Sequence, residues 1–281
     1  MSERIEVKKT YKLFIGGAFP RSESGRTYEV HAHDGTFLAN PALASRKDLR
    51  DAVVVARSAH SGWSKATAYN RGQILYRIAE MLEGRADQFA TEISALDGIS
   101  TKDALKEVHQ AVDRWVWYAG WSDKLSALAG ATNPVSGPYF NFTIPEPMGV
   151  VGAIAPEKNS LLGLIDAIAP IIVSGNSVIV LASNRAPLPA MTFAEVLATS
   201  DLPAGVCNIL TGATSELAPW FASHMDIDGL DISGVDHDLR SDIKIAGAEN
   251  LKRIHSFGEK HSPARILSFM EFKTTWHPIG V

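Results

Sequence analysis

Short apolar segments alternate with helix-length segments between Gly149 and Phe257, and this alternation constrains the fold more than any other feature. The apolar segments are mainly aliphatic and β-branched, as expected for strands buried on both faces of a sheet. Parallel neighbours need crossover connections, which the intervening segments supply as helices. We therefore predict an α/β fold with a doubly wound, Rossmann-like parallel sheet, a type that binds nucleotides at the carboxyl ends of its strands. The predicted strands are 149–155, 176–181, 206–210, 229–233 and 251–257, and the predicted helices are 161–173, 187–199, 215–224 and 236–249.

The segments on either side of this core follow other patterns. Before it, period-3.6 apolar stripes predict N-terminal helices at 46–61, 70–96 and 102–120, the second one broken near Gly84. Residues 11–15 and 28–30 are predicted to form two strands of a small hairpin. A further β-hairpin is predicted at 132–147, and residues 267–276 alternate as a strand does. This tail strand follows the core by about ten residues, too few for a crossover, so we expect it to join the second hairpin.

Composition excludes several classes of partner. The formal net charge of −4 over 281 residues provides no basic surface for nucleic acid. No apolar run reaches the length of a membrane span. The first ten residues lack the apolar segment of a secretory signal, and one cysteine allows no intramolecular disulfide. We predict a cytoplasmic protein that binds neither nucleic acid nor membrane.

Several motifs in a fixed order resemble those of the aldehyde dehydrogenase superfamily. They are Phe-Ile-Gly-Gly at 14–17, Pro-Glu-Pro-Met-Gly-Val-Val-Gly at 145–152, Gly-Asn-Ser-Val-Ile-Val at 175–180, Leu-Pro-Ala-Gly-Val-Cys-Asn-Ile-Leu-Thr-Gly at 202–212, and Met-Glu-Phe-Lys-Thr-Thr-Trp at 270–276. The resemblance implies a nucleotide-binding-type domain at 1–257, with the hairpin 132–147 inserted as part of a small β oligomerisation sheet. It also implies a linker and a C-terminal oligomerisation strand at 258–281.

The cofactor positions implied by this resemblance are mostly substituted. The family's Pro-Trp-Asn after the first core strand is Pro156-Glu157-Lys158 here, and its ribose-binding Lys and Glu correspond to Leu181 and Asn184. Its Phe-Thr-Gly-Ser turn survives only as Ser233 and Gly234, and acidic residues follow at Asp236 and Asp238. A glycine-rich turn binds phosphate because its backbone can approach the anion closely. We therefore predict no NAD(P) binding, or weak binding at most, at a vestigial site. The site positions are Pro156, Lys158, Leu181, Asn184, Ser233 and Gly234.

The resemblance implies a catalytic domain that this chain lacks. In the family, a general-base Glu and a whole domain with the nucleophilic Cys follow the strand that corresponds to 251–257. Here about ten residues lead to the tail strand, too few for a domain. Cys207 lies in an apolar strand and is predicted to be a core residue. His237 lies between two Asp residues, at a helix start that capping and the helix dipole explain. We predict no catalytic residue and no metal ligand.

These observations predict a short, degenerate family member that is inactive by itself. The expected function is a pseudoenzyme that acts as an assembly subunit, with itself or with a full-length aldehyde dehydrogenase. The alternative is an NAD(P)-binding, oxidoreductase-type subunit that contributes to aldehyde oxidation within a complex. The expected interface residues are Tyr139, Phe140, Phe142, Phe269, Phe272 and Trp276.

Overall fold

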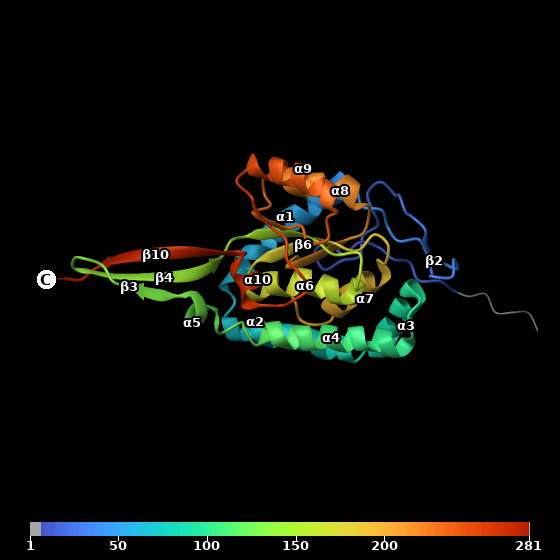
Figure 1. The fold of residues 1–281 in the computed structure, drawn as a ribbon, viewed down its shortest axis with the longest axis horizontal. Helices are drawn as coiled ribbons and strands as arrows, with labels where there is room; N and C mark the ends of the chain where they lie inside the picture. The colour runs from blue at the N-terminus through green and yellow to red at the C-terminus, as the bar shows by residue number, and fades with distance from the viewer. Residues whose placement is uncertain (1–6, 281) are drawn as a thin grey trace, which may run out of the picture.

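Five parallel strands form the central sheet of the computed structural model, which describes residues 7–280. Their spatial order is β7-β6-β5-β8-β9, so the order reverses at β5 (Figure 1). The predicted doubly wound α/β fold is confirmed. The strands are β5 (Val150–Ile154), β6 (Ser177–Leu181), β7 (Cys207–Leu210), β8 (Gly229–Asp231) and β9 (Arg253–His255).

Helices cover both faces of this sheet. Val151 and Ala153 of β5 belong to the apolar core on one face, whereas Val150 and Ile154 belong to the core on the other face. This division follows from the period of two in a strand. The first core includes α6 (Ser160–Val173) and α7 (Leu188–Leu197). The second includes α1 (Arg46–Lys65), α8 (Thr214–Ser223) and α9 (His237–Ala248).

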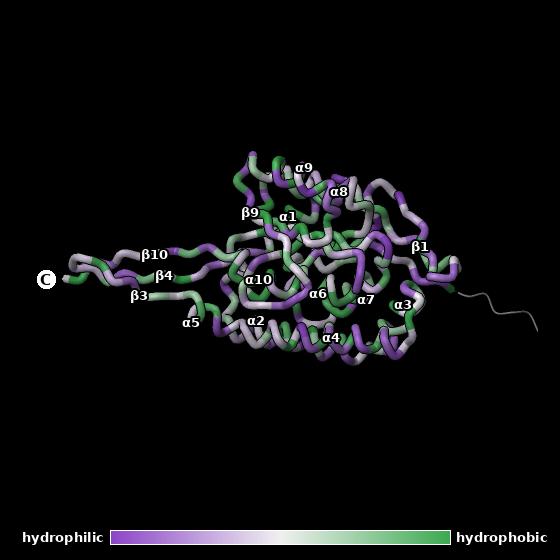
Figure 2. The backbone as a smooth tube through the Cα atoms, viewed as in Figure 1, coloured by the Kyte–Doolittle hydropathy of each residue, from purple (hydrophilic) through white to green (hydrophobic). Residues whose placement is uncertain are grey.

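The N-terminal helices α2 (Ala68–Glu83), α3 (Ala86–Asp97) and α4 (Thr101–Ala119) pack outside α6 and α7, whereas α1 packs on the other face of the sheet. Ser45 begins α1 with a capping box that Asp48 completes. The predicted break near Gly84 is confirmed, because Gly84 ends the helix before it and a new helix begins at Ala86. Hydrophilic and hydrophobic residues alternate along α4 in Figure 2, as an amphipathic helix requires. Before the sheet, α5 (Leu125–Ala129) follows α4. Among residues 7–280, no helix combines the length and the apolar character needed to cross a membrane.

The predicted hairpin between residues 11–15 and 28–30 is wrong. The amide of Phe14 donates to the carbonyl of Ile209 at 2.9 Å, so this segment extends the edge of the central sheet beside β7. The strand β1 (Val30–His31) pairs instead with β2 (Phe37–Ala39). Alternation in the sequence identifies a strand but does not identify its neighbour. The first six residues, where the sequence shows no secretory signal, lie outside the described range.

A three-stranded antiparallel sheet projects from the body, and we call it the arm (Figure 1). It consists of β3 (Ala131–Asn133), β4 (Tyr139–Pro147) and β10 (Met270–Pro278) in the order β10-β4-β3. The prediction that the tail strand joins the second hairpin is confirmed. Met270 lies opposite Pro147 next to the body, and Pro278 lies opposite Tyr139 at the far end of the arm.

The segment 256–269, between β9 and β10, packs into the body. It contains one short helix, α10 (Pro263–Leu267), and both Ile266 and Phe269 are completely buried. The rings of His255 and Phe257 lie 5.4 and 5.9 Å from the ring of Phe269. The prediction that Phe269 belongs to an interface is therefore wrong, because its side chain lies inside the core, just before the arm begins.

Candidate functional site

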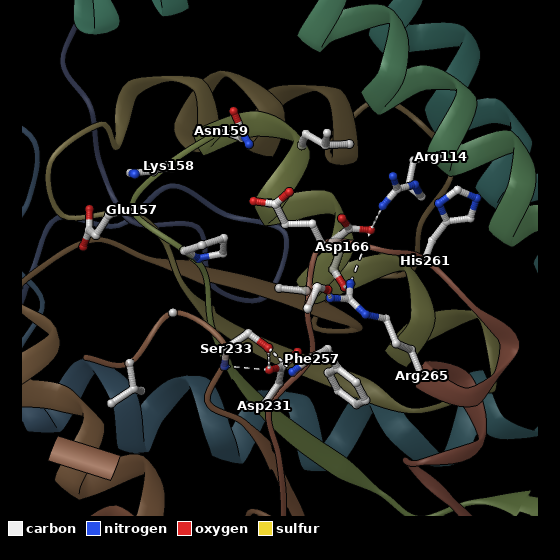
Figure 3. A pocket seen from close by; sticks show the side chains of 18 of the residues that line it. Arg114, Glu157, Lys158, Asn159, Asp166, Asp231, Ser233, Phe257, His261 and Arg265 are labelled. Carbon is white, nitrogen blue, oxygen red and sulfur yellow. Dashed lines mark hydrogen bonds and ion pairs between the residues drawn. The ribbon is translucent and has the colours of Figure 1, made fainter. Parts of the chain in front are cut away.

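A cavity of about 950 Å³ lies at the carboxyl ends of β5 and β8 (Figure 3). Its walls come from residues 156–159 after β5, residues 233–236 after β8, and the segment after β9, with α4 and α6 on the remaining side. The strand order reverses between these two strands. Doubly wound sheets bind their ligands at this place, because the loops diverge there and leave a crevice. We therefore take this cavity as the candidate site.

Asp166 joins three elements on one side of the cavity. It is the sole charged residue of α6, and its carboxylate pairs with Arg114 of α4. Nη1 of Arg265, from α10, lies 3.4 Å from the same carboxylate oxygen and donates to the Asp166 carbonyl at 3.2 Å. Arg265 also lies over the ring of Phe257, 5.0 Å from its centroid. Asp166 and Arg265 are almost completely buried, so the pairing anchors the segment before the arm to the sheet's helical layer.

Asp231 lies at the floor of the cavity, at the end of β8. Its carboxylate accepts hydrogen bonds from the amide and the hydroxyl of Ser233, and the Ser233 hydroxyl accepts one from the amide of Phe257 at 2.8 Å. Burial raises the pKa of Asp231 to about 6, although the two Ser233 bonds act against that increase. Ser233, one of the predicted cofactor positions, thus connects the loops after β8 and β9.

Glu157 follows β5, and its carboxylate accepts three hydrogen bonds from the loop after β6. It accepts from the hydroxyl of Ser183 at 2.6 Å, from the amide of Asn184 at 3.2 Å and from the amide of Arg185 at 3.0 Å. These donors lie where the family resemblance implies contact with the cofactor's ribose. Because these donors already form hydrogen bonds to Glu157, they are less available to form hydrogen bonds to a ligand.

Glu107 occupies the N-terminus of α6 in a similar way. Its Oε1 accepts from the amides of Leu161 and Leu162 at 3.1 and 3.2 Å. The residue before the helix, Asn159, has a left-handed backbone with φ of 51° and makes no capping bond through its side chain. Burial raises the pKa of Glu107, while the two amide bonds lower it. A helix N-terminus is a ready anion site, and here an acidic side chain of α4 fills it.

The structure brings together four of the six predicted cofactor positions. Pro156, Lys158, Ser233 and Gly234 line the cavity, and Lys158 is exposed. Gly234 is required by packing, because a Cβ there would overlap the carbonyl of Ala155. The other two positions lie outside the lining. Leu181 is completely buried in the core, and Asn184 contributes its amide to Glu157.

The acidic residues at the start of α9 do not cap the helix in the predicted way. Asp236 occupies the cap position but makes no side-chain capping bond, so the prediction of capping is wrong for this residue. Asp236, His237 and Asp238 are all exposed. The negative charges of Asp236 and Asp238 still interact favourably with the N-terminal end of the helix dipole. In the described part of the chain, no cluster of His, Cys, Asp and Glu could hold a metal ion.

Cys207 is the single cysteine of the chain and lies at the start of β7. Its side chain is 1% exposed, which confirms the prediction that it is a core residue. Burial raises the pKa of its thiol far above the usual value. A reactive cysteine needs a lowered pKa and access to its substrate, and this thiol has neither.

The charged residues that organise the cavity were not predicted from the sequence. Arg114, Arg265 and Glu107 lie on amphipathic or short helices, where charged residues are ordinary. Asp166 and Asp231 did carry a signal, because each is a single carboxylate inside an apolar segment predicted to be buried. A buried carboxylate needs a partner, so these two residues could have been selected as candidates.

Comparison with known proteins identifies related chains. A model of the aldehyde dehydrogenase family matches residues 19–275. The cytosolic 10-formyltetrahydrofolate dehydrogenase of Mus musculus is 32% identical over 261 residues, which cover 90% of this chain and 28% of that protein. An aldehyde dehydrogenase of Davidiella tassiana is 31% identical over 244 residues, 86% of this chain and 49% of the relative.

Solved structures of aldehyde dehydrogenases superpose on most of this chain. The aldehyde dehydrogenase KauB of Pseudomonas aeruginosa superposes with a TM-score of 0.82 at 29% identity, over 88% of this chain and 50% of that one. The NAD⁺ complex of an aldehyde dehydrogenase of Bacillus cereus gives a TM-score of 0.82 at 26% identity, with the same coverage. The chain thus spans about half the length of these aldehyde dehydrogenases and less than a third of the formyltetrahydrofolate dehydrogenase.

Proposed function

The chain belongs to the aldehyde dehydrogenase family, and we propose that it is a non-catalytic member that serves as an assembly subunit. In this proposal it oxidises no aldehyde by itself and associates with a second copy or with a full-length aldehyde dehydrogenase. It works in the cytoplasm and binds neither nucleic acid nor membrane. The whole proposal rests on the short connection between β9 and β10.

That connection leaves no room for a catalytic domain. A domain requires at least about 50 residues, whereas residues 256–269 alone separate the two strands. The segment is also no loose remnant, because Ile266 and Phe269 are completely buried and Arg265 pairs with Asp166. The chain therefore packs into the core directly after β9, where the family resemblance implies that a domain with a general base and a nucleophile would follow. Acyl transfer needs an activated thiolate together with an oxyanion donor, and Cys207 is buried on another strand.

The arm supports an assembly function. Phe140, Phe272 and Trp276 are 48%, 49% and 58% exposed on a sheet that projects from the body. Clustered aromatic residues on an exposed sheet mark an interaction surface, and Tyr and Trp often anchor such surfaces. The predicted interface residues other than Phe269 all lie on this arm.

Two measurements test the proposal. The purified chain is assayed for NADH or NADPH formation with a panel of aldehydes, beside a full-length family member as positive control. Its mass in solution is measured alone and after co-expression with the full-length member. We expect no reduced cofactor above background, and a mass larger than that of one chain. Turnover that persists in repeatedly purified protein, or a monomer that joins no family member, would refute the corresponding part of the proposal.

The cavity favours a second candidate function, an NAD(P)-binding subunit that contributes to aldehyde oxidation within a complex. Its volume of about 950 Å³ and its place at the strand reversal suit a large ligand. Against this, Glu157 and Glu107 already occupy nearby donors. Calorimetric titration with NAD⁺ and NADP⁺ decides between the two: a micromolar dissociation constant favours this second function.

A matched pair of variants makes that titration sharper. Glu107→Gln removes the negative charge at the start of α6, and Glu259→Gln removes one from an exposed position of the cavity wall. If Glu107 competes with a dinucleotide phosphate, only the first variant should strengthen binding. Equal effects of both variants would show that the general charge of the cavity controls binding.

A further inference from the structure

Arg114, in the wall of the cavity, has hydrogen-bond donors that the described chain does not use. Its guanidinium donates to the carboxylate of Asp166 through Nη1, and within residues 7–280 neither Nε nor Nη2 has a partner. The side chain is 11% exposed, but these two atoms are reached by solvent. Because most buried donors in proteins are satisfied, the free edge of this guanidinium is available to a molecule in the cavity.

The free edge of Arg114 matches a carboxylate in shape. Nε and Nη2 lie on one side of the planar guanidinium, and their N–H groups point in the same direction. A carboxylate accepts both in a side-on pair of parallel hydrogen bonds, which is stronger and more directional than a contact with a single donor. A lysine ammonium has no such edge. The geometry therefore selects an anion with two oxygen atoms in one plane.

The pairing around Asp166 holds this edge in place. Nη1 of Arg265 donates to the Asp166 carbonyl at 3.2 Å, and its Nη2 donates to the Gly258 carbonyl at 2.5 Å. Asp166 and Arg265 are almost completely buried. Figure 3 shows Arg114, Asp166 and Arg265 together on one side of the cavity, with Lys158 on the other. A donor that is already held loses less freedom when a ligand binds.

The electrostatic potential beside Arg114 is positive, and His261 reports it. Burial lowers the pKa of His261, and Arg114 and Arg265 lower it further, whereas Asp166 raises it. The two guanidinium groups together with burial thus outweigh the carboxylate at this side of the cavity. An anion is therefore favoured at the place where the free edge of Arg114 lies.

We propose that this part of the cavity binds a small organic acid, with its carboxylate on the free edge of Arg114 and its apolar body against Trp117. Trp117 lies three residues after Arg114 on α4, and both line the cavity, so the two side chains share one face of the helix. The rings of Trp117 and His261 lie 4.6 Å apart, and Leu162 of α6 extends this wall. The inference does not depend on the proposed assembly function. Oxidation of an aldehyde yields an acid of this class, so a full-length family member would produce such ligands.

The acidic residues of the cavity favour one negative charge over two. Asp113, Asp236 and Glu259 line the cavity from exposed positions, so salt screens their repulsion in part. Asp231 opposes Arg265 from the floor. A phosphate dianion meets about twice the repulsion that a monocarboxylate meets. The volume of about 950 Å³ leaves room for an apolar body behind the charged end, which an organic acid has and inorganic phosphate lacks.

Matched acids and amides test the proposal on the full chain. Benzoate and benzamide share their shape, but only benzoate carries a charge, and hexanoate and hexanamide repeat the comparison with an aliphatic body. Ligand-observed NMR and calorimetry should give a dissociation constant of about 1 mM or lower for an acid. The matching amide should bind about tenfold more weakly, or worse. Equal binding of acid and amide would overturn the proposal, as would tighter binding of inorganic phosphate than of either acid.

Three variants locate the site. Arg114→Gln should weaken benzoate binding about tenfold or more. Arg114→Lys keeps the positive charge beside Asp166 but lacks the two-donor edge, so it should weaken binding too. Lys260→Gln removes an exposed positive charge from the segment that carries Arg265, outside the cavity lining, and should bind benzoate as the parent does. Circular dichroism and the urea midpoint check each fold, and the lysine variant alone decides the question if the glutamine variant does not fold.

The outcomes separate this inference from the proposed function. If Arg114→Lys binds benzoate as tightly as the parent, or Lys260→Gln weakens binding equally, the site at Arg114 is wrong and the assembly measurements keep their meaning. If neither acid binds, the inference is again wrong. A chain that joins no family member but binds benzoate through Arg114 overturns the assembly function and leaves this site intact.

Discussion

Replacing Phe269 by alanine tests whether the segment before the arm belongs to the core of the body. The side chain is completely buried and contacts the rings of His255 and Phe257 at centroid distances of 5.4 and 5.9 Å. A buried phenylalanine removes roughly 150–250 Å² from water, which corresponds to about 4–6 kcal/mol at roughly 25 cal/mol per Å². Measured truncations of buried Phe residues cost about 3–5 kcal/mol. We therefore expect Phe269→Ala to lower the free energy of unfolding by about 3–5 kcal/mol.

The assay is urea unfolding followed by circular dichroism, with Phe140→Ala as the matched control. Phe140 is 48% exposed on the arm and contacts Phe142 at a ring distance of 5.4 Å. Its truncation should cost about 1 kcal/mol or less. If Phe269→Ala costs no more than this control, the segment 256–269 does not help to close the body. The principal support for a chain without a catalytic domain would then be lost.

Three further predictions follow from the buried charges and the thiol. Asp166→Ala leaves Arg114 and Arg265 without their buried carboxylate, and urea unfolding should show a loss of about 3–5 kcal/mol. Burial raises the folded-state pKa of Asp231 from 3.8 to about 6. The contribution of this carboxyl group to stability is therefore fully present below pH 3.8, falls as the pH rises, and is lost once the pH has passed 6. The loss is about 3 kcal/mol, and Asp231→Asn should remove this part of the pH dependence of the urea midpoint. Cys207 should resist a thiol reagent in native protein and react fully in denaturant, and rapid native labelling would contradict its burial.

Several elements could be predicted because their causes are local. The break between α2 and α3 occurs at Gly84, because glycine is a poor helix former and readily ends a helix. The strands β5 and β6 follow from mainly aliphatic segments of the right length. The partner of Phe14 could not be predicted in this way, because its bridge to Ile209 joins segments almost two hundred residues apart.

The candidate site could likewise be predicted only in part from the sequence. Pro156 and Gly234 could be placed near it, because loops after neighbouring strands of a doubly wound sheet converge. The contacts that occupy the site come from distant elements: Glu107 reaches α6 from α4, and Arg265 reaches Asp166 from the segment before the arm. A single sequence contains the charges of these residues but does not state which of them meet.

The sequence by itself determined the alternation of strands and helices, the family likeness and the short connection before the arm, since each can be read from neighbouring residues. Tertiary structure alone decided that Phe269 is buried, that Glu107 and Glu157 occupy nearby backbone donors, and that β10 pairs with β4 along its whole length. The physical reason is the range of the interactions involved. Periodicity and turn chemistry act over a few residues, whereas burial and ion pairing depend on which distant segments the folded chain brings together.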